Sequence, residues 1–336
     1  MTPTADDDFQ PSWWLRSPHL QSMLASSSLR RRLHGRRARD LEARAESMIL
    51  DCGDGVRLAG RYTTQHIADA PRGLVVLFHG WEGSTRSTYV LQNGARLLAE
   101  GWDVFRLNFR DHGDSHALNA GIFHSCRLDE VVGALVALQA RCSARPLALV
   151  GFSLGGNFAL RVALRAPAAG LDLARTIAVC PVIDPHAGLF QLELAPRMYH
   201  DYFMWKWRRS LKAKQRAFTD TELFTHADLR GSLRSLTEAL VLKHTDFGSL
   251  DNYLDGYSLA GDRLAGLRVP ASILATCDDP VCPATDLATM QLPESVEVTV
   301  TRHGGHCGFI GDWRLQSWAE DYIAARLARI PQPQQA

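Results

Sequence analysis

The chain has 336 residues, and its 46% hydrophobic and 22% charged content is that of a globular protein with a sizeable core. Its 37 basic and 36 acidic residues leave a net charge of +1, which argues against nucleic acid as the main partner. The seven cysteines are odd in number and include no Cys-x-x-Cys pair, so we expect a reducing compartment rather than a disulfide framework or a zinc site.

No targeting signal is expected at the beginning of the chain. Its first residues, MTPTADDDFQPSWW, are acidic and polar, and the sequence contains no run of 18 apolar residues. The sequence therefore predicts no signal peptide and no transmembrane segment, with the cytoplasm as the expected location. No cofactor is expected.

Residues 1–45 are expected to form an N-terminal arm that packs on the body of the protein. Within this arm, residues 1–10 are expected to be disordered, whereas Trp13 and Trp14 should pack on the body. Six arginines follow at 30–39. We expect them to be solvated, because charge runs usually face water. The alternative is a basic surface for anionic lipid or an acidic partner, so peripheral membrane contact stays open.

Residues 46–330 predict one α/β domain. Strand-like runs alternate with helical runs, which is typical of βαβ crossovers and a mainly parallel sheet. The eight expected strands lie at 47–52, 56–63, 73–78, 104–108, 147–150, 176–180, 271–275 and 296–301. The expected helices lie at 89–100, 128–141, directly after 153, and at 313–330. The tail, 331–336, is expected to be disordered.

The alternation is interrupted at about 186–262. This stretch shows no clear strand and is rich in aromatic and charged residues. We interpret it as a helical lid inserted over the carboxyl ends of the strands, with aromatic residues at helical spacing in the lid's own core. A cofactor-binding set of aromatic residues is the alternative, and lipid contact by the segment near Trp205 also stays open.

One motif carries the clearest chemical signal. The apolar residues 147–150 predict a buried strand, and a helical run follows the motif G-x-S-x-G at 151–155. Between a strand and a helix this motif is a nucleophile elbow, a strained turn that exposes the serine hydroxyl. Because Gly151 and Gly155 have no Cβ, the strand and the helix can pass closely. Ser153 is therefore the candidate nucleophile, and a small-residue turn without chemistry is the alternative.

The candidate base follows the last predicted strand, where the carboxyl ends of the strands should form a site. An imidazole has a pKa near neutrality and can take the proton of a serine hydroxyl. Of the two histidines there, His306 is preferred over His303. Gly305 and Gly308 flank His306 and allow a loop to bring it to the serine, whereas His303 follows the strand directly and can pack against a neighbour.

The candidate acid follows the preceding strand, which completes the expected order Ser, Asp, His. A buried carboxylate holds the imidazole in one tautomer, and its loss lowers the rate on the order of 10⁴-fold in serine proteases. Asp279 is preferred over Asp278, because Pro280 biases it towards an extended conformation. Asp278 is suited instead to bonding the backbone of its own turn. The choice between the two stays open.

Two backbone N–H groups should bind the oxyanion. Leu154 follows the nucleophile and begins the helix, so it is expected to supply one of them. The loop after the third strand should supply the other, and Trp81, directly after His79 and Gly80, is the candidate. A plain turn at the end of the strand is the alternative for His79 and Gly80.

Three histidines, His112, His116 and His124, lie near acidic residues in one predicted loop. Their spacing matches no zinc or calcium pattern. We therefore expect a loop that is hydrogen-bonded across the end of the sheet and no metal, with a metal site as the alternative.

Ten short segments carry a resemblance to a known family: 14–16, 19–21, 79–80, 82–84, 108–113, 123–125, 151–157, 202–203, 278–280 and 305–309. On these segments the chain resembles the YheT-like branch of the α/β-hydrolase superfamily over most of residues 11–320. The resemblance implies an α/β-hydrolase fold and an intracellular serine hydrolase acting on carboxylic esters, including acyl lipids. Its triad falls on Ser153, Asp279 and His306. Members from higher organisms often carry an N-terminal membrane anchor, which is not expected for this sequence.

The resulting hypothesis is a serine esterase that cleaves short-to-medium acyl or lipid esters through an acyl-enzyme. The first alternative is an acyltransferase that passes the same acyl group to an alcohol. The second is a catalytically idle binding module, which the presence of all three triad residues disfavours. Epoxide hydrolysis and dehalogenation need an aspartate at the elbow, so Ser153 argues against both. Chain length, the alcohol portion and the oligomeric state are not predicted.

Overall fold

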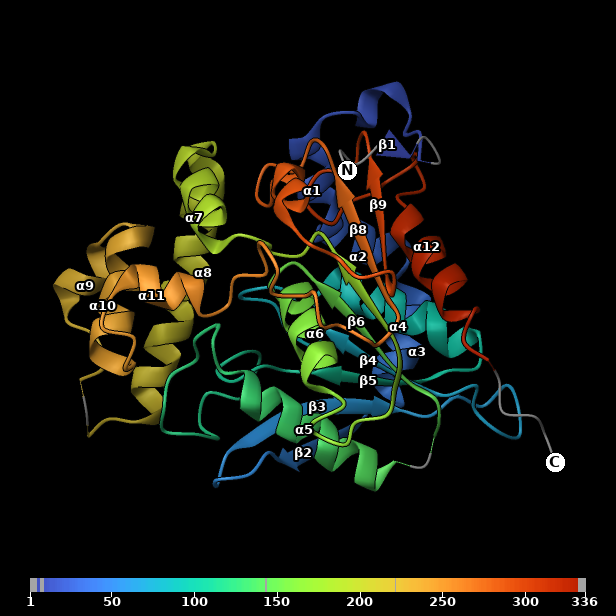
Figure 1. Cartoon of the computed structure of the whole chain (residues 1–336), viewed down its shortest axis with the longest axis horizontal. Helices are drawn as coiled ribbons and strands as arrows, with labels where there is room; N and C mark the ends of the chain where they lie inside the picture. Colours follow the sequence, from blue (N-terminus) through green and yellow to red (C-terminus); the bar gives the residue numbers. More distant parts are fainter. Residues whose placement is uncertain (1–4, 7–8, 143, 221, 332–336) are drawn as a thin grey trace.

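One mixed sheet organises the chain in the computed structural model, which describes residues 5–6, 9–142, 144–220 and 222–331. The strand order is β1-β9-β8-β7-β6-β4-β5-β3-β2 (Figure 1). Strand β3 pairs antiparallel with β2 and β5, and all the other described pairings are parallel. The expected, mostly parallel sheet is therefore confirmed.

All eight expected strands are present. They are β2 (Glu46–Asp51), β3 (Arg57–Thr63), β4 (Leu74–Phe78), β5 (Asp103–Leu107), β6 (Leu147–Phe152), β7 (Leu173–Val179), β8 (Ala271–Thr276) and β9 (Val296–Thr301). A ninth strand, β1 (Ala5–Asp6), pairs with β9 at the edge of the sheet. The expectation of disorder over 1–10 is therefore wrong for this pair, because the free edge of β9 offers it backbone partners.

The helices before the insertion are η1 (Trp13–Leu15), α1 (Pro18–Ala25), α2 (Ser28–Leu33), α3 (Gly35–Ala43), α4 (Thr88–Ala99), α5 (Leu128–Arg141) and α6 (Leu154–Arg165). Those from the insertion onwards are α7 (Pro185–Leu194), α8 (Arg197–Ala217), α9 (His226–Arg230), α10 (Leu233–His244), α11 (Leu250–Asp255), η2 (Ala284–Thr289) and α12 (Trp318–Leu327). The last helix begins later than expected, because a β-bridge joins Ile310 and Ser317 just before it. The predicted tail from 332 onwards lies outside the described residues.

Alternate residues of the central strands face two apolar layers. Leu74, Val76 and Phe78 of β4 pack in a cluster with α5 and α6, whereas Val75 and Leu77 pack with α3, α4 and α12. This alternation follows from the period of two in a strand. Helices therefore cover both faces, and the carboxyl ends of the strands are left for loops.

The segment expected to be a helical insertion carries α7 to α11, which gather at one side of the sheet (Figure 1). These helices have an apolar cluster of their own, in which Trp207 of α8 is buried. The expectation that the aromatic residues form this core is wrong for Tyr202 and Trp205, whose exposed fractions are 47% and 56%. Among the described residues, no helix combines the length and the apolar character that crossing a membrane requires.

The N-terminal arm differs from its expected form at two points. Trp13 and Trp14 are 81% and 41% exposed, so they do not pack on the body as expected. Arg30, expected to be solvated, is only 1% exposed. Its guanidinium donates to the carbonyls of Leu315 (3.1 Å) and Ala25 (3.0 Å) and pairs with Glu320, which compensates for its lost hydration.

The arm also contributes to the core, and this leads to a first prediction. Leu41 of α3 is fully buried in the cluster with α4 and α12. Leu41→Ala is expected to lower the free energy of unfolding by about 2–5 kcal/mol, through lost burial and the cavity left behind. Leu33→Ala is the matched control, since that side chain is 57% exposed and should change stability by less than about 0.5 kcal/mol.

Urea unfolding of both variants and the wild type gives the comparison. If Leu41→Ala unfolds at the wild-type denaturant concentration, the arm is not part of the cooperative core.

Candidate active site

Ser153 occupies a strained turn between β6 and α6. Its φ and ψ angles are 54° and −122°, which a residue with a side chain adopts at a cost of about 1–3 kcal/mol. The surrounding backbone holds this turn. The Ser153 N–H donates to the Val179 carbonyl at 2.9 Å, and the Ser153 carbonyl accepts the Gly156 N–H at 2.8 Å. The side chain at the tip of the turn lines a cavity.

The two glycines of the motif are required by close backbone contacts. A Cβ on Gly151 would lie 2.1 Å from the Gly155 carbonyl oxygen. A Cβ on Gly155 would lie 2.4 Å from the carbonyl oxygen of His79 and 2.6 Å from that of Phe78. The start of α6 therefore rests directly on the end of β4. A nucleophile elbow needs these close passages, as expected from the spacing of the motif.

The loop after β4 passes beside the elbow. A Cβ on Gly80 would lie 3.1 Å from the Cβ of Ser153. His79 is fully buried beneath this loop, and burial lowers its pKa well below the ordinary range. Its Nδ1 donates to the Gly80 carbonyl (2.7 Å), and its Nε2 accepts the Phe109 N–H (3.2 Å). A backbone N–H can only donate, so the imidazole is neutral and its proton is on Nδ1.

A second buried histidine holds the other side of the same loop. His112 Nε2 accepts the Glu82 N–H at 3.1 Å, and His112 Nδ1 donates to the Arg110 carbonyl at 2.7 Å. Glu82 has a positive φ of 54°, so this hydrogen bond supports a strained backbone. Burial lowers the pKa of His112 to about 4, which keeps it neutral. Trp81 lies between the residues that these two histidines fix.

The predicted oxyanion donors are thus carried by rigid elements. The Leu154 N–H belongs to the first turn of α6, where backbone N–H groups lack partners within the helix. The Trp81 N–H belongs to the loop that His79 and His112 brace. Both residues line the cavity that Ser153 lines. Their role as donors stays a prediction.

His306 and Asp279 form a close pair. His306 Nδ1 lies 2.9 Å and 3.1 Å from the two Asp279 carboxylate oxygens. The Asp279 side chain is only 1% exposed, and one of its oxygens also accepts the N–H groups of Val281 (2.8 Å) and Cys282 (2.9 Å). The carboxylate is therefore fixed as an acceptor, Nδ1 carries the shared proton, and Nε2 is the basic nitrogen.

The Asp279 carboxylate stabilises the protonated form of the His306 imidazole. Burial by itself lowers the pKa of His306, but the Asp279 carboxylate raises it, and the net direction is well above the ordinary value. His306 also lines the cavity that contains Ser153.

Asp278, the other candidate acid, has a different set of partners. Its carboxylate accepts the Thr276 hydroxyl (2.6 Å) and the Gly305 N–H (2.9 Å), and it lies 3.5 Å from His303 Nδ1. The structure thus brings Asp279, and not Asp278, to His306. Asp278 connects the loop after β8 to the loop that carries His306.

A contact with the N-terminal arm completes the position of His306. The His306 N–H donates to the Ser22 hydroxyl of α1 at 2.8 Å. Gln21, which is fully buried, donates to the Ile310 carbonyl (2.9 Å) and accepts the Ile310 N–H (2.7 Å). No sequence pattern predicted a role for Ser22 or Gln21. Residues 19–21 were among the segments that carry the family resemblance, which was the available signal.

The loop after β5, which carries His112, His116 and His124, is hydrogen-bonded to α8 of the insertion and within itself. Asp111 pairs with Lys214 of α8 at 2.7 Å, and its other oxygen accepts the Phe123 N–H at 2.8 Å. His116 Nε2 lies 2.9 Å from the Ser210 hydroxyl of α8. The loop after β5 therefore ties the insertion to the sheet, in line with the expected hydrogen-bonded loop.

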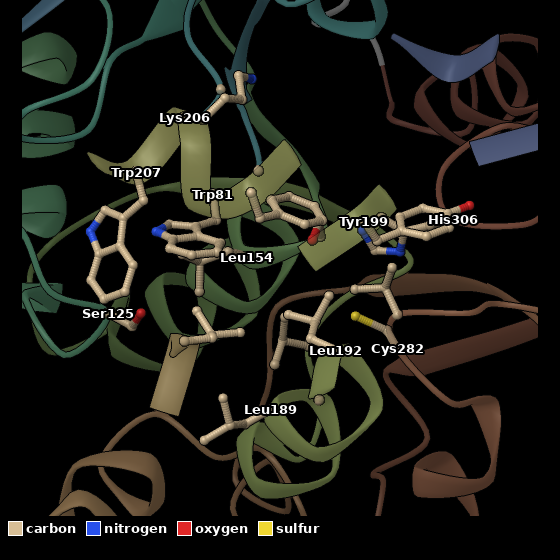
Figure 2. A pocket seen from close by; sticks show the side chains of 18 of the residues that line it. Trp81, Ser125, Leu154, Leu189, Leu192, Tyr199, Lys206, Trp207, Cys282 and His306 are labelled. Carbon is tan, nitrogen blue, oxygen red and sulfur yellow. The ribbon is translucent and has the colours of Figure 1, made fainter. Parts of the chain in front are cut away.

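The cavity has a volume of about 550 Å³, within the usual range for small-molecule sites. Its walls are mainly apolar: Figure 2 shows Leu154, Leu189 and Leu192 with Trp81 and Trp207, while His306 lies at one end. Met23 of α1 and Met198 of α8 line it as well, yet they are 48% and 54% exposed. We therefore place the mouth of the cavity between α1 and α8.

Comparison with known sequences identifies relatives over most of the chain. A family model described as alpha/beta hydrolase fold matches residues 73–312. "Putative esterase YheT" of Escherichia coli (strain K12) is 28% identical over 323 residues, which cover 94% of this chain and 92% of that protein. Human "Protein ABHD15" is 31% identical over 133 residues, which cover 38% of this chain and 28% of that protein.

Solved structures show the same architecture. The esterase Pf2001 of Pyrococcus furiosus superposes with a TM-score of 0.53 at 16% identity, covering 87% of this chain and 92% of that one. The 2,6-dihydroxy-pseudo-oxynicotine hydrolase superposes with a TM-score of 0.56 at 19% identity, covering 90% and 74%. At these identities the likeness concerns the fold alone.

The tight contact at the elbow leads to a second prediction. Gly155→Ala is expected to lower the melting temperature, because its Cβ would collide with two backbone carbonyl oxygens that cannot move aside. Overpacking costs typically about 1–3 kcal/mol, and the upper end is expected here. In the control Gly266→Ala, the new Cβ would meet only Leu164 Cδ1, at 3.7 Å.

Thermal unfolding followed by circular dichroism compares the two variants with the wild type. The control should melt with the wild type. A melting temperature of Gly155→Ala equal to that of the wild type would mean that α6 does not contact the end of β4 so closely in solution.

Proposed function

The chain belongs to the alpha/beta hydrolase family, whose YheT-like members it resembles, and we propose that it is a serine hydrolase that cleaves carboxylic esters. The proposed catalytic residues are Ser153, Asp279 and His306. The main support is the Asp279–His306 pair, because its imidazole lines the cavity into which the strained elbow directs Ser153. A carboxylate on Nδ1 leaves Nε2 as the base that this chemistry needs.

The proposed reaction has two halves. His306 Nε2 takes the hydroxyl proton of Ser153 as the oxygen attacks the ester carbonyl carbon. The resulting oxyanion accepts the N–H groups of Trp81 and Leu154, each worth about 10²–10³ in rate. The alcohol then leaves with the proton from His306, which forms the acyl-enzyme. Water repeats the sequence on the acyl group and regenerates the free serine.

The cavity favours an ester with an apolar acyl chain. Leucines and aromatic rings form most of the lining, and burial of each methylene against them contributes about 0.8 kcal/mol. The half-exposed Met23, Met198 and Tyr202 extend this apolar surface to the mouth. Short-to-medium acyl esters and lipid esters are therefore the proposed substrates. The seven free cysteines support a reducing compartment such as the cytoplasm.

A series of p-nitrophenyl esters from acetyl to palmitoyl tests the proposal on the wild type and Ser153→Ala. We expect a preferred chain length in the wild type and loss of nearly all activity in the variant, because removal of a triad serine abolishes acyl-enzyme formation. If the wild type hydrolyses none of the esters faster than the variant, ester hydrolysis is ruled out. Acyl transfer to an added alcohol or ligand binding would then be tested next.

The two adjacent aspartates provide a matched pair for a separate prediction. Asp279→Asn should lower kcat on the order of 10⁴-fold, because an amide cannot stabilise the imidazolium. Asp278→Asn should lower it less than about tenfold. The amide oxygen that replaces the carboxylate can still accept the Gly305 N–H. Even the loss of one hydrogen bond worth about 1 kcal/mol would lower the rate only about fivefold. Equal losses would remove Asp279 from its proposed role.

A further inference from the structure

Two buried thiols that the proposed reaction does not use lie beside its base. Cys180 follows β7, and Cys307 follows His306 in the chain; they are 1% and 7% exposed. The Sγ atoms of Cys180 and Cys307 and a ring nitrogen of His306 all lie within 4.8 Å of one another. The proposed mechanism explains the histidine but neither cysteine.

The backbone fixes the thiols in this arrangement. Cys180 and Cys307 have positive φ angles of 45° and 60°, which non-glycine residues adopt only where their surroundings determine them strongly. The Cys180 N–H donates to the Leu274 carbonyl at 2.7 Å. The Cys307 N–H lies 3.4 Å from the Cys180 sulfur. The pair is therefore preorganised, with no long side chain left to order.

The surroundings of His306 match those of a metal-binding histidine. Such a histidine usually donates its second ring N–H to a carboxylate, which orients the ring and raises its basicity. Asp279 provides this contact at 2.9 Å from Nδ1, so Nε2 is the nitrogen available to a metal. The carboxylate that prepares His306 as a base thus also prepares it as a ligand.

We propose that Cys180, Cys307 and His306 form a site for a soft divalent cation, with Zn²⁺ as the reference ion, and that its occupation inhibits the hydrolase. Zn²⁺ binds sulfur at about 2.3 Å and imidazole at about 2.0–2.1 Å, which places tetrahedral ligand atoms about 3.5–3.8 Å apart. Since the three ligand atoms lie within 4.8 Å of one another, they need to approach by about 1.0–1.3 Å at most. Thiolate ligands select Zn²⁺ and other soft ions over Mg²⁺ and Ca²⁺.

Binding requires no electron transfer. Each thiol releases one proton to solvent, and a protonated His306 releases its Nε2 proton as well; two sulfur–metal bonds and one nitrogen–metal bond form, and water fills the fourth position. The ion can arrive through the cavity, because His306 and Cys307 both line it. Once the lone pair of Nε2 is held by the metal, it cannot take the proton of Ser153. This inhibition rests on the proposed function, whereas the metal binding itself does not.

Metal binding is tested first with Cd²⁺, under a phosphine reductant that keeps the thiols reduced. The wild type should bind one Cd²⁺ per chain and develop the ultraviolet thiolate-to-cadmium absorption. Cys180→Ala and Cys307→Ala should each weaken binding by at least about 100-fold, beyond the 10–100-fold typical of an outer partner. Cys277→Ala removes the exposed thiol outside the group and is the matched control. It should bind like the wild type.

Inhibition is tested with Zn²⁺ in the ester assay. The wild type and Cys277→Ala should lose activity and regain it with a chelator, whereas Cys180→Ala should resist the same Zn²⁺ concentration. Cys180→Ser replaces Cys180→Ala if circular dichroism shows the latter to be unfolded. Ser153→Ala should still bind Cd²⁺, because metal binding does not depend on the hydrolase activity. A wild type that binds Cd²⁺ but hydrolyses no ester would therefore disprove the proposed function and not the metal site.

Two results would overturn the proposal. In the first, Cys180→Ala and Cys307→Ala both bind Cd²⁺ with the same affinity and absorption as the wild type, which would mean that the thiols are not ligands. The other is tight metal binding by an active wild type without inhibition, which would mean that Nε2 stays free.

Discussion

The reactive end of this molecule depends on a backbone contact that leaves no space for a side chain. The first turn of α6 rests on the carbonyl oxygens at the end of β4, so that a Cβ on Gly155 would lie 2.4 Å from the nearer one. Because β4 and β6 are hydrogen-bonded neighbours in the sheet, this contact joins the elbow to the loop that carries Trp81. Ser153, the proposed nucleophile, and both predicted oxyanion donors therefore belong to one backbone unit.

Buried polar groups hold the loops around this unit. His79 and His112 act as neutral braces, each accepting one backbone N–H and donating to one carbonyl. Asp111 and Lys214 connect the loop after β5 to α8 of the insertion. A buried polar group costs free energy unless it is fully paired, so each brace is specific to one loop conformation. The inner part of the insertion is thereby fixed, while its outer residues border the mouth of the cavity.

The features that could be predicted from the sequence are those with a local pattern. The strands follow from short apolar runs, the elbow from the glycine spacing, and the preference for Asp279 over Asp278 from the proline after it. The missed features are contacts between residues far apart in the chain. Arg30 belongs to a run of arginines that usually faces water, and its burial is explained by the distant Glu320 and Leu315 together with the Ala25 carbonyl. Trp13 and Trp14 lie exposed although aromatic residues usually pack.

The thiol pair illustrates the same limit. Zinc sites are recognised by cysteines and histidines a few residues apart, whereas Cys180 and Cys307 are brought together only by the ends of distinct strands and their loops. The positive φ angles of these two cysteines also cannot be predicted from the residue type. The cysteine count therefore argued against a disulfide framework, but it carried no information about which thiols lie close together.

The hydrogen bond between Ser22 and the His306 N–H links residues 284 positions apart, and this has a consequence for biosynthesis. A ribosome delivers α1 long before the loop with His306. A nascent chain therefore contains the elbow, the loop after β4 and most of the cavity lining well before His306 can bond to Ser22. The proposed active site is therefore assembled only when these two distant segments meet, after the His306 loop has left the ribosome.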